Sequence, residues 1–159
     1  MLAVAPSEGK SFEALVAVLQ ERHAERLATK AFLPFFPAFP KRKTEIKVVT
    51  AGLIYDSDAA TRGAVSAGES STGNAGESEP RLGLLATSNY ELSAAAGARC
   101  AEQNALGLLI HYSVPPSAVR YIVDISHSVF AERMDKPVPL ALGPCPICCG
   151  EETPSFEPF

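Results

Sequence analysis

The sequence predicts a single α/β domain, and three observations lead to this fold class. In residues 11–31 the apolar side chains recur on one stripe at helical spacing, and Ser11 is placed to cap that helix. Residues 46–55, 82–87 and 119–129 are rich in Val, Ile, Leu and Tyr, which is typical of strands. A second helical pattern covers residues 98–112. A chain of 159 residues can bury one core of this kind.

The order of these segments predicts how they pair. We expect residues 46–55 and 82–87 to be partners in one sheet. Because the helix at 98–112 lies between two strands, it predicts a βαβ unit with a right-handed crossover and parallel strands. The apolar side chains of this helix predict a largely buried face made of Leu106, Leu108, Leu109 and Ile110.

Residues 32–40 connect the first helix to the first strand and contain three prolines and four phenylalanines. The prolines exclude a regular helix, since each lacks a backbone N–H and restricts the chain. The phenylalanines must pack on something. Two interpretations stay open, a hydrophobic plug beneath a loop and the wall of a substrate site.

Two further segments complete the predicted domain, which spans residues 1–159. Residues 59–80 contain mainly Gly, Ser, Ala and Glu and almost no large apolar side chains. Such a segment recovers little ordering entropy by burial, so we expect a flexible insertion between the first two strands. Gly150 and Pro154 predict that no helix continues far beyond the cysteines. We expect residues 150–159 to form an irregular tail.

The overall charge and composition argue against several classes of protein. The formal net charge is −4, whereas a sequence-independent nucleic-acid binder needs clustered positive charge. No apolar run has the length of a membrane span, and the first residues lack the pattern of a secretory signal. Three of four cysteines crowd together, which favours metal binding in a reducing compartment over disulfides. We therefore expect a cytoplasmic protein without nucleic-acid or membrane partners.

Cys100, Cys145 and Cys148 form the most informative pattern in the chain. Cys145 and Cys148 are three residues apart, so on a helical turn both sulfurs face one side. A zinc ion with three protein ligands keeps its fourth position for water, and Glu102 is placed to move the protons of that water. A structural zinc site with Cys149 as fourth ligand, and no metal at all, remain alternatives.

The segment Cys100-Ala101-Glu102, followed by Pro144-Cys145-Pro146-Ile147-Cys148, resembles the signature of zinc deaminases. Asn89-Tyr90-Glu91 is similar to the Asn-x-Glu pair of the small, tetrameric cytidine deaminases, at the spacing usual in that family. Phe39-Pro40 is similar to a Phe-Pro pair whose ring lies beside the pyrimidine. The resemblance implies Zn²⁺ on Cys100, Cys145 and Cys148, Glu102 as the catalytic residue, and Asn89, Glu91 and Phe39 as substrate-binding residues.

This resemblance also implies a three-layer α-β-α sheet with helices on both faces, and a homo-oligomer that deaminates cytidine or deoxycytidine to the uridine analogue. Two features depart from the family. Gln103 and Cys149 stand where family members usually carry arginine, and we expect the last two strands of the family's sheet to be missing. An alternative is therefore a catalytically degenerate deaminase fold that serves as a subunit of a larger assembly. A nucleic-acid editing deaminase agrees less well with the acidic charge.

Overall fold

The computed structural model describes residues 10–65, 81–93 and 97–141. Their elements are, in chain order, α1 (Phe12–Ala28), the 3-10 turn η1 (Leu33–Phe35), β1 (Glu45–Asp56), α2 (Ser57–Val65), β2 (Leu82–Ser88), β3 (Tyr90–Ser93), β4 (Gly97–Arg99), α3 (Ala101–His111), η2 (Pro116–Ala118), β5 (Val119–Phe130), η3 (Ala131–Arg133) and β6 (Val138–Pro139). The strands and long helices predicted from the sequence are thus confirmed within a few residues. The predicted cap is also present, because the Ser11 side chain accepts a hydrogen bond from the Ala14 N–H.

The main sheet has the strand order β2-β1-β5-β6, and each neighbouring pair is antiparallel. The predicted pairing of β1 with β2 is confirmed. Because β2 and β5 are both antiparallel to β1, they run in the same direction, but β1 lies between them. The predicted parallel direction of the two strands that flank α3 is therefore confirmed, with β1 inserted between them. β3 and β4 form a separate two-stranded sheet.

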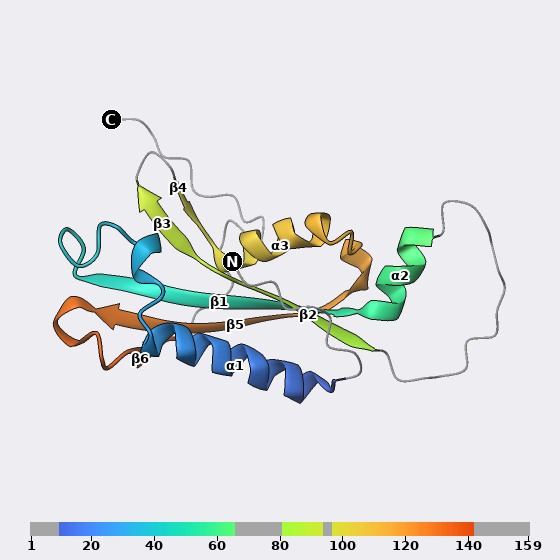
Figure 1. Ribbon diagram of the computed structural model, residues 1–159, viewed down its shortest axis with the longest axis horizontal. Coiled ribbons are helices and arrows are strands. Elements are labelled where there is room, and N and C mark those ends of the chain that lie inside the picture. The colour runs from blue at the N-terminus through green and yellow to red at the C-terminus, as the bar shows by residue number, and fades with distance from the viewer. Residues whose placement is uncertain (1–9, 66–80, 94–96, 142–159) are drawn as a thin grey trace.

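Helix α1 covers one face of the sheet, below β1 and β5 in the view of Figure 1. Leu15 and Leu19 of α1 are buried against Ile54 and Leu84, which belong to β1 and β2. Gly52 allows this close approach, because a Cβ atom there would lie 2.9 Å from Leu19 Cδ2. The helix thus packs directly on the strand backbone at this position.

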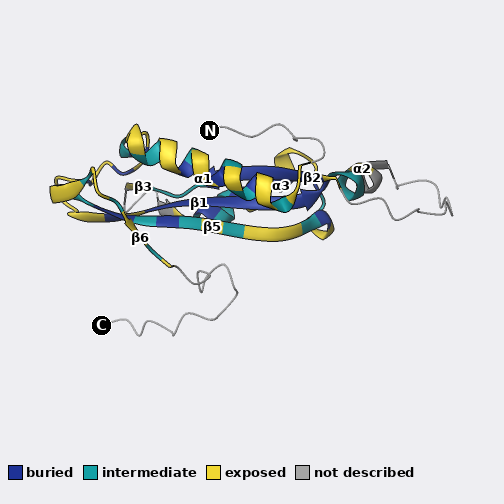
Figure 2. Cartoon of the chain, turned by 90° about the horizontal axis from the view of Figure 1, so that it is seen from below, coloured by how far each residue is buried: buried dark blue, intermediate teal, exposed yellow. Residues whose placement is uncertain are grey.

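Helix α3 covers the opposite face, where Leu53 and Leu85 of the strands are buried with Ala105 and Leu109 of the helix. Neighbouring residues of β1 therefore face different helices, as the alternation of side chains along a strand requires. Because both helices pack on these strands, β1 and β2 are buried, whereas β5 is partly exposed (Figure 2).

The predicted buried face of this helix needs one correction. Leu108 and Leu109 are buried, but Leu106 is 46% exposed and Ile110 is 84% exposed. Four nearly consecutive residues cannot share one helical face, because neighbours differ by 100° around the helix axis. The exposed pair lies on the outer side of α3.

The segment before β1 behaves as a hydrophobic plug. Phe32, Phe36 and Phe39 are buried in one cluster with Ile46, Val48 and Val129. Phe35 is 44% exposed and lines a cavity instead. The plug interpretation therefore holds for three of the four phenylalanines, and Phe35 lies beside a cavity.

The predicted insertion differs from the structure at its start. Its first residues belong to helix α2, which follows β1 directly. Asp56 accepts hydrogen bonds from the Asp58 and Ala59 N–H groups, which supports the first turn of this helix. Residues 66–80 and the predicted tail 150–159 lie outside the described residues. In the described parts of the chain, no helix is long and apolar enough to cross a membrane.

Candidate active site at the start of helix α3

Cys100 and Glu102 lie at the N-terminus of α3, the first residue as the helix cap and the second in the first turn. Both side chains are partly buried. The exposed N–H groups and the dipole of a helix N-terminus favour anionic groups, including a thiolate. A sulfur and a carboxylate are therefore held two residues apart at one helix end.

Three contacts fix this helix end on the sheet. The buried Thr87 hydroxyl donates to the Ala101 carbonyl at 2.6 Å, and the Asn104 side chain donates to the Ser88 carbonyl at 2.8 Å. Ala101 is fully buried against Val49 and Ala51 of β1. The end of β2 and the middle of β1 together determine where Cys100 and Glu102 stand.

Asp124 of β5 is a further acidic residue at this place, and sequence reasoning missed it. It lies opposite Ala51 in the strand register, on the face that α3 covers. Its carboxyl group keeps solvent-exposed surface, but partial burial raises its pKa to about 6, and the nearby Glu102 contributes. A signal was present, because Asp124 interrupts the apolar run of its strand.

The predicted sugar-binding residues make contacts of their own. The Asn89 side chain accepts a hydrogen bond from the Val49 N–H at 2.9 Å and donates to the Lys47 carbonyl at 2.7 Å. Its amide thereby continues the ladder between β1 and β2. Glu91 forms an ion pair with Lys43, with 2.6 Å between Oε2 and Nζ.

Phe39, the predicted wall of the substrate site, is buried in the cluster of phenylalanines described above. The described structure thus brings Glu102 together with Cys100 and Asp124. It gives Asn89 backbone contacts, Glu91 a lysine partner and Phe39 an apolar environment.

The predicted zinc ligands can be followed only in part. Cys100 stands at the start of α3, whereas Cys145 and Cys148 lie outside the described residues. Within residues 10–65, 81–93 and 97–141, no three His, Cys, Asp or Glu side chains gather as a metal site. The donor set that the structure describes therefore consists of one sulfur with a carboxylate beside it.

His23 and His127 form an internal contact on the other face of the sheet. His23 is buried, with Nδ1 2.8 Å from Thr50 Oγ1 and Nε2 2.9 Å from His127 Nδ1. Burial lowers the pKa of His23 to about 4, with smaller contributions from His127 and Arg26, and burial also lowers the pKa of His127. Both ring nitrogens of His23 therefore have protein partners. Its partner, 104 residues away, could not be predicted.

These features describe a mixed α/β protein of the deaminase-like class, with helices packed on a four-stranded sheet and a Cys-Ala-Glu segment opening one helix. The family model of the LmjF365940 subfamily of CDD/CDA-like deaminases matches residues 24–122, more than half of the chain. The chain therefore belongs to this subfamily of the deaminase superfamily. No curated protein and no solved structure matches the chain.

The matched range includes Asn89, Glu91, Cys100 and Glu102, and it ends before Cys145 and Cys148. Membership of the superfamily is thus independent of the second half of the predicted zinc motif. The particular substrate is not decided by this match.

Proposed function

We propose that this protein is a zinc-dependent hydrolytic deaminase that acts on cytidine or deoxycytidine. The observation that carries the proposal is the position of Cys100 and Glu102 on the first turn of α3 in a chain of the deaminase superfamily. Cys100, Cys145 and Cys148 would hold the zinc ion. When bound, the ion would make a coordinated water more acidic.

Glu102 has the chemistry required for the proton transfers. Water adds to C4 of the cytosine ring, and the carboxylate takes one of its protons. Glu102 then gives a proton to the ring nitrogen N3 and assists transfer to the amino group, which leaves as ammonia. The product is the uracil ring, so the reaction consumes one water and releases one ammonia.

The test measures zinc content and cytidine turnover on the purified full chain. We expect about one zinc per chain and conversion of cytidine to uridine. Glu102→Gln should retain the zinc and lower kcat by about 10²–10⁴-fold, the usual contribution of a positioned proton-transfer group. Gln103→Ala, next to it on the same turn, is the matched control. A wild-type chain that holds zinc but turns over neither nucleoside would contradict the proposal.

A second candidate function is a degenerate deaminase fold that acts as a structural subunit. The contacts of Asn89 and Glu91 favour it, because both predicted sugar-binding side chains have protein partners. In this case Glu102→Gln would leave the biological role intact, whereas Cys145→Ser would remove the zinc and destabilise the chain. Comparing these two variants in cells separates the two functions.

We also propose that the protein works as a homo-oligomer or within a larger assembly. Leu106 and Ile110 support this, since two large apolar side chains are exposed side by side on one turn of α3. Light scattering on the purified chain should give a mass above that of one chain. Ile110→Lys should lower this mass, and a monomeric wild type would contradict a homo-oligomer.

A further inference from the structure

A cavity of about 490 Å³ lies between the second half of α1, the η1 turn and the end of β2. Its walls include Arg22 and Arg26 from α1, Phe35 from η1, and Leu92 from β3. Cys100, Glu102 and Phe39 are not among the residues that line it. The cavity therefore does not include Cys100 or Glu102, but it adjoins the start of α3, because Asn89 and Asn104 contribute to its wall.

Arg26 is the most informative residue of this cavity, because its charge is poorly compensated. Its guanidinium donates to the Val49 carbonyl at 3.5 Å and to the Asn89 carbonyl at 3.4 Å, both long for hydrogen bonds. No carboxylate in the described part of the chain forms an ion pair with it. Burial lowers the pKa of Arg26 to about 10, so the group is still charged at neutral pH.

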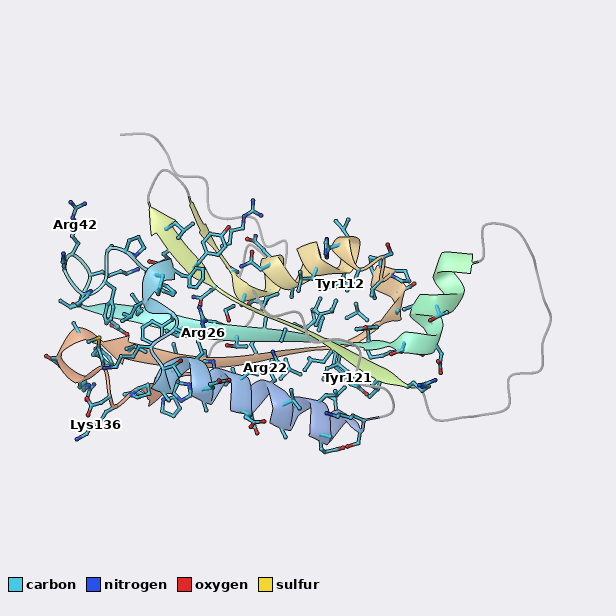
Figure 3. The ribbon with its side chains drawn as sticks, viewed as in Figure 1. Arg22, Arg26, Arg42, Tyr112, Tyr121 and Lys136 are labelled. Carbon is cyan, nitrogen blue, oxygen red and sulfur yellow. The ribbon has the colours of Figure 1, made fainter. Side chains whose placement is uncertain are left out.

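A guanidinium has five N–H donors, and partly buried charges in proteins are normally paired. Arg22 adds a second guanidinium to the same wall, and Figure 3 shows both side chains reaching from α1 towards the strands. Glu25 also lines the cavity, but it is an exposed residue. The cavity thus offers two cations, one of them without a strong partner, against one solvated carboxylate.

We propose that this cavity is a second binding site, which takes a small anionic molecule whose phosphate or carboxylate group contacts Arg26 and Arg22. Paired N–H donors of a guanidinium match the two oxygens of such a group. Phe35 and Leu92 provide apolar surface for a flat hydrophobic body. The volume falls within the range of small-molecule sites, which is about 300–1,000 Å³.

The experiment measures binding to the full chain by calorimetry, with phenyl phosphate, benzoate, inorganic phosphate and neutral benzyl alcohol as probes. We expect phenyl phosphate and benzoate to bind, inorganic phosphate to bind more weakly, and benzyl alcohol not to bind. The stronger of the two aromatic anions identifies the preferred head group. Arg26→Gln should weaken the binding of that anion by about tenfold or more, as expected for lost hydrogen bonds to a charged group.

Arg42→Gln is the matched control, because Arg42 lies on the exposed loop before β1 and extends away from the cavity (Figure 3). Arg26→Lys, which keeps the charge, and Ala31→Phe, which fills the cavity from its exposed rim, guard against misfolding. We expect partial binding in the first and loss of binding in the second. Equal binding by wild type and Arg26→Gln, or no binding of either aromatic anion, would overturn the proposal.

The anion site uses neither Cys100 nor Glu102, and the experiment separates it from the proposed deaminase activity. Each titration is repeated with Glu102→Gln, whose binding of the aromatic anions should match that of wild type. Loss of binding in Glu102→Gln would place the anion at the start of α3 and would also contradict a separate site.

Discussion

The two faces of the sheet share the strand β1, yet the two helices that cover them leave different surfaces. On the α1 face, the apolar side chains are packed tightly around Gly52, and the buried His23 has protein partners on both ring nitrogens. On the α3 face, the helix covers β1 and β2, while Asp124 on β5 keeps exposed surface next to Glu102. One face buries satisfied polar groups, and the other keeps acidic groups accessible.

This difference agrees with the proposed function, in which the α3 face serves chemistry and the α1 face serves stability. Buried polar groups with partners fix one packing arrangement, whereas proton transfer requires carboxylates that a substrate can reach. Five predictions test the contrast, and they begin with the largest expected effect.

Leu19→Ala should have the largest effect on stability. Leu19 is fully buried between α1 and the sheet, and removing such a side chain usually lowers the free energy of unfolding by about 2–5 kcal/mol. Urea denaturation measures the change. Leu106→Ala, the same substitution at an exposed position of α3, should cost less than about 1 kcal/mol. Equal costs would remove the distinction between the packed α1 face and the outer side of α3.

The His23 pair should make stability depend on pH. The folded-state pKa of about 4 is below the ordinary value of 6.5, so the unfolded chain binds protons more readily between these values. Stability from His23 is therefore complete above pH 6.5 and is lost as the pH falls, by about 2 kcal/mol at pH 5. Urea denaturation of wild type and His23→Gln, above pH 6.5 and at pH 5, measures this change. The variant should lose less stability than wild type on acidification.

Asp124 should act in the opposite direction on the other face. Its pKa of about 6 lies above the ordinary value, so its protonation on acidification stabilises the folded state. The effect should be small because the carboxyl group keeps solvent contact. Asp124→Asn should therefore lose slightly more stability than wild type between neutral pH and pH 5. A smaller loss in this variant would contradict the assigned direction.

Thr87→Val tests how α3 is anchored. The buried hydroxyl bonds to the Ala101 carbonyl, and replacing it with a methyl group removes this bond, which should cost about 0.5–1.5 kcal/mol in the free energy of unfolding. Thr61→Val is the matched control, since the Thr61 hydroxyl makes a similar bond to the Ser57 carbonyl at an exposed position of α2. We expect at most about 0.5 kcal/mol for the control, measured in the same way. Similar costs at both positions would mean that the buried bond from Thr87 to Ala101 stabilises the protein no more than the exposed bond in α2.

The ion pair of Lys43 and Glu91 should have the smallest effect. Both side chains are well exposed, at 46% and 38%, so Lys43→Ala should cost less than about 1 kcal/mol and less still at high salt. Arg120→Ala is the useful comparison, because it removes the partner of the buried Asp56 carboxylate and should cost more. A large, salt-independent loss of stability in Lys43→Ala would contradict this and would mean that the ion pair with Glu91 has a structural role.

Much of the fold could be predicted because its signals are local. The stripe at residues 11–31 and the Val- and Ile-rich segments gave α1, β1, β2 and β5 within a few residues. The Cys100-Ala101-Glu102 segment was placed correctly at a helix start, and the match of the deaminase family to residues 24–122 agrees with it. The helix α2 was missed because Ser57–Val65 contains no Leu, Ile, Phe or Met to mark a buried face.

The candidate site was less predictable because its contacts join distant residues. Asp124 meets Glu102 only because β5 lies beside β1, and the sequence pattern did not predict this pairing. The surroundings of the Arg26 charge also depend on packing. Its guanidinium contacts the Val49 and Asn89 carbonyls only because α1 packs on the sheet.

By itself the sequence determined which segments are helices and strands, since the spacing of apolar side chains favours burial of one particular face in each. It also placed a sulfur and a carboxylate two residues apart at a helix start. The strand order, the contact of His23 with His127 and the accessible acidic pair were decided only by the tertiary structure. The physical reason is that these contacts arise from packing α1 and α3 on opposite faces of β1, and the strand pattern does not show that β5 pairs with β1.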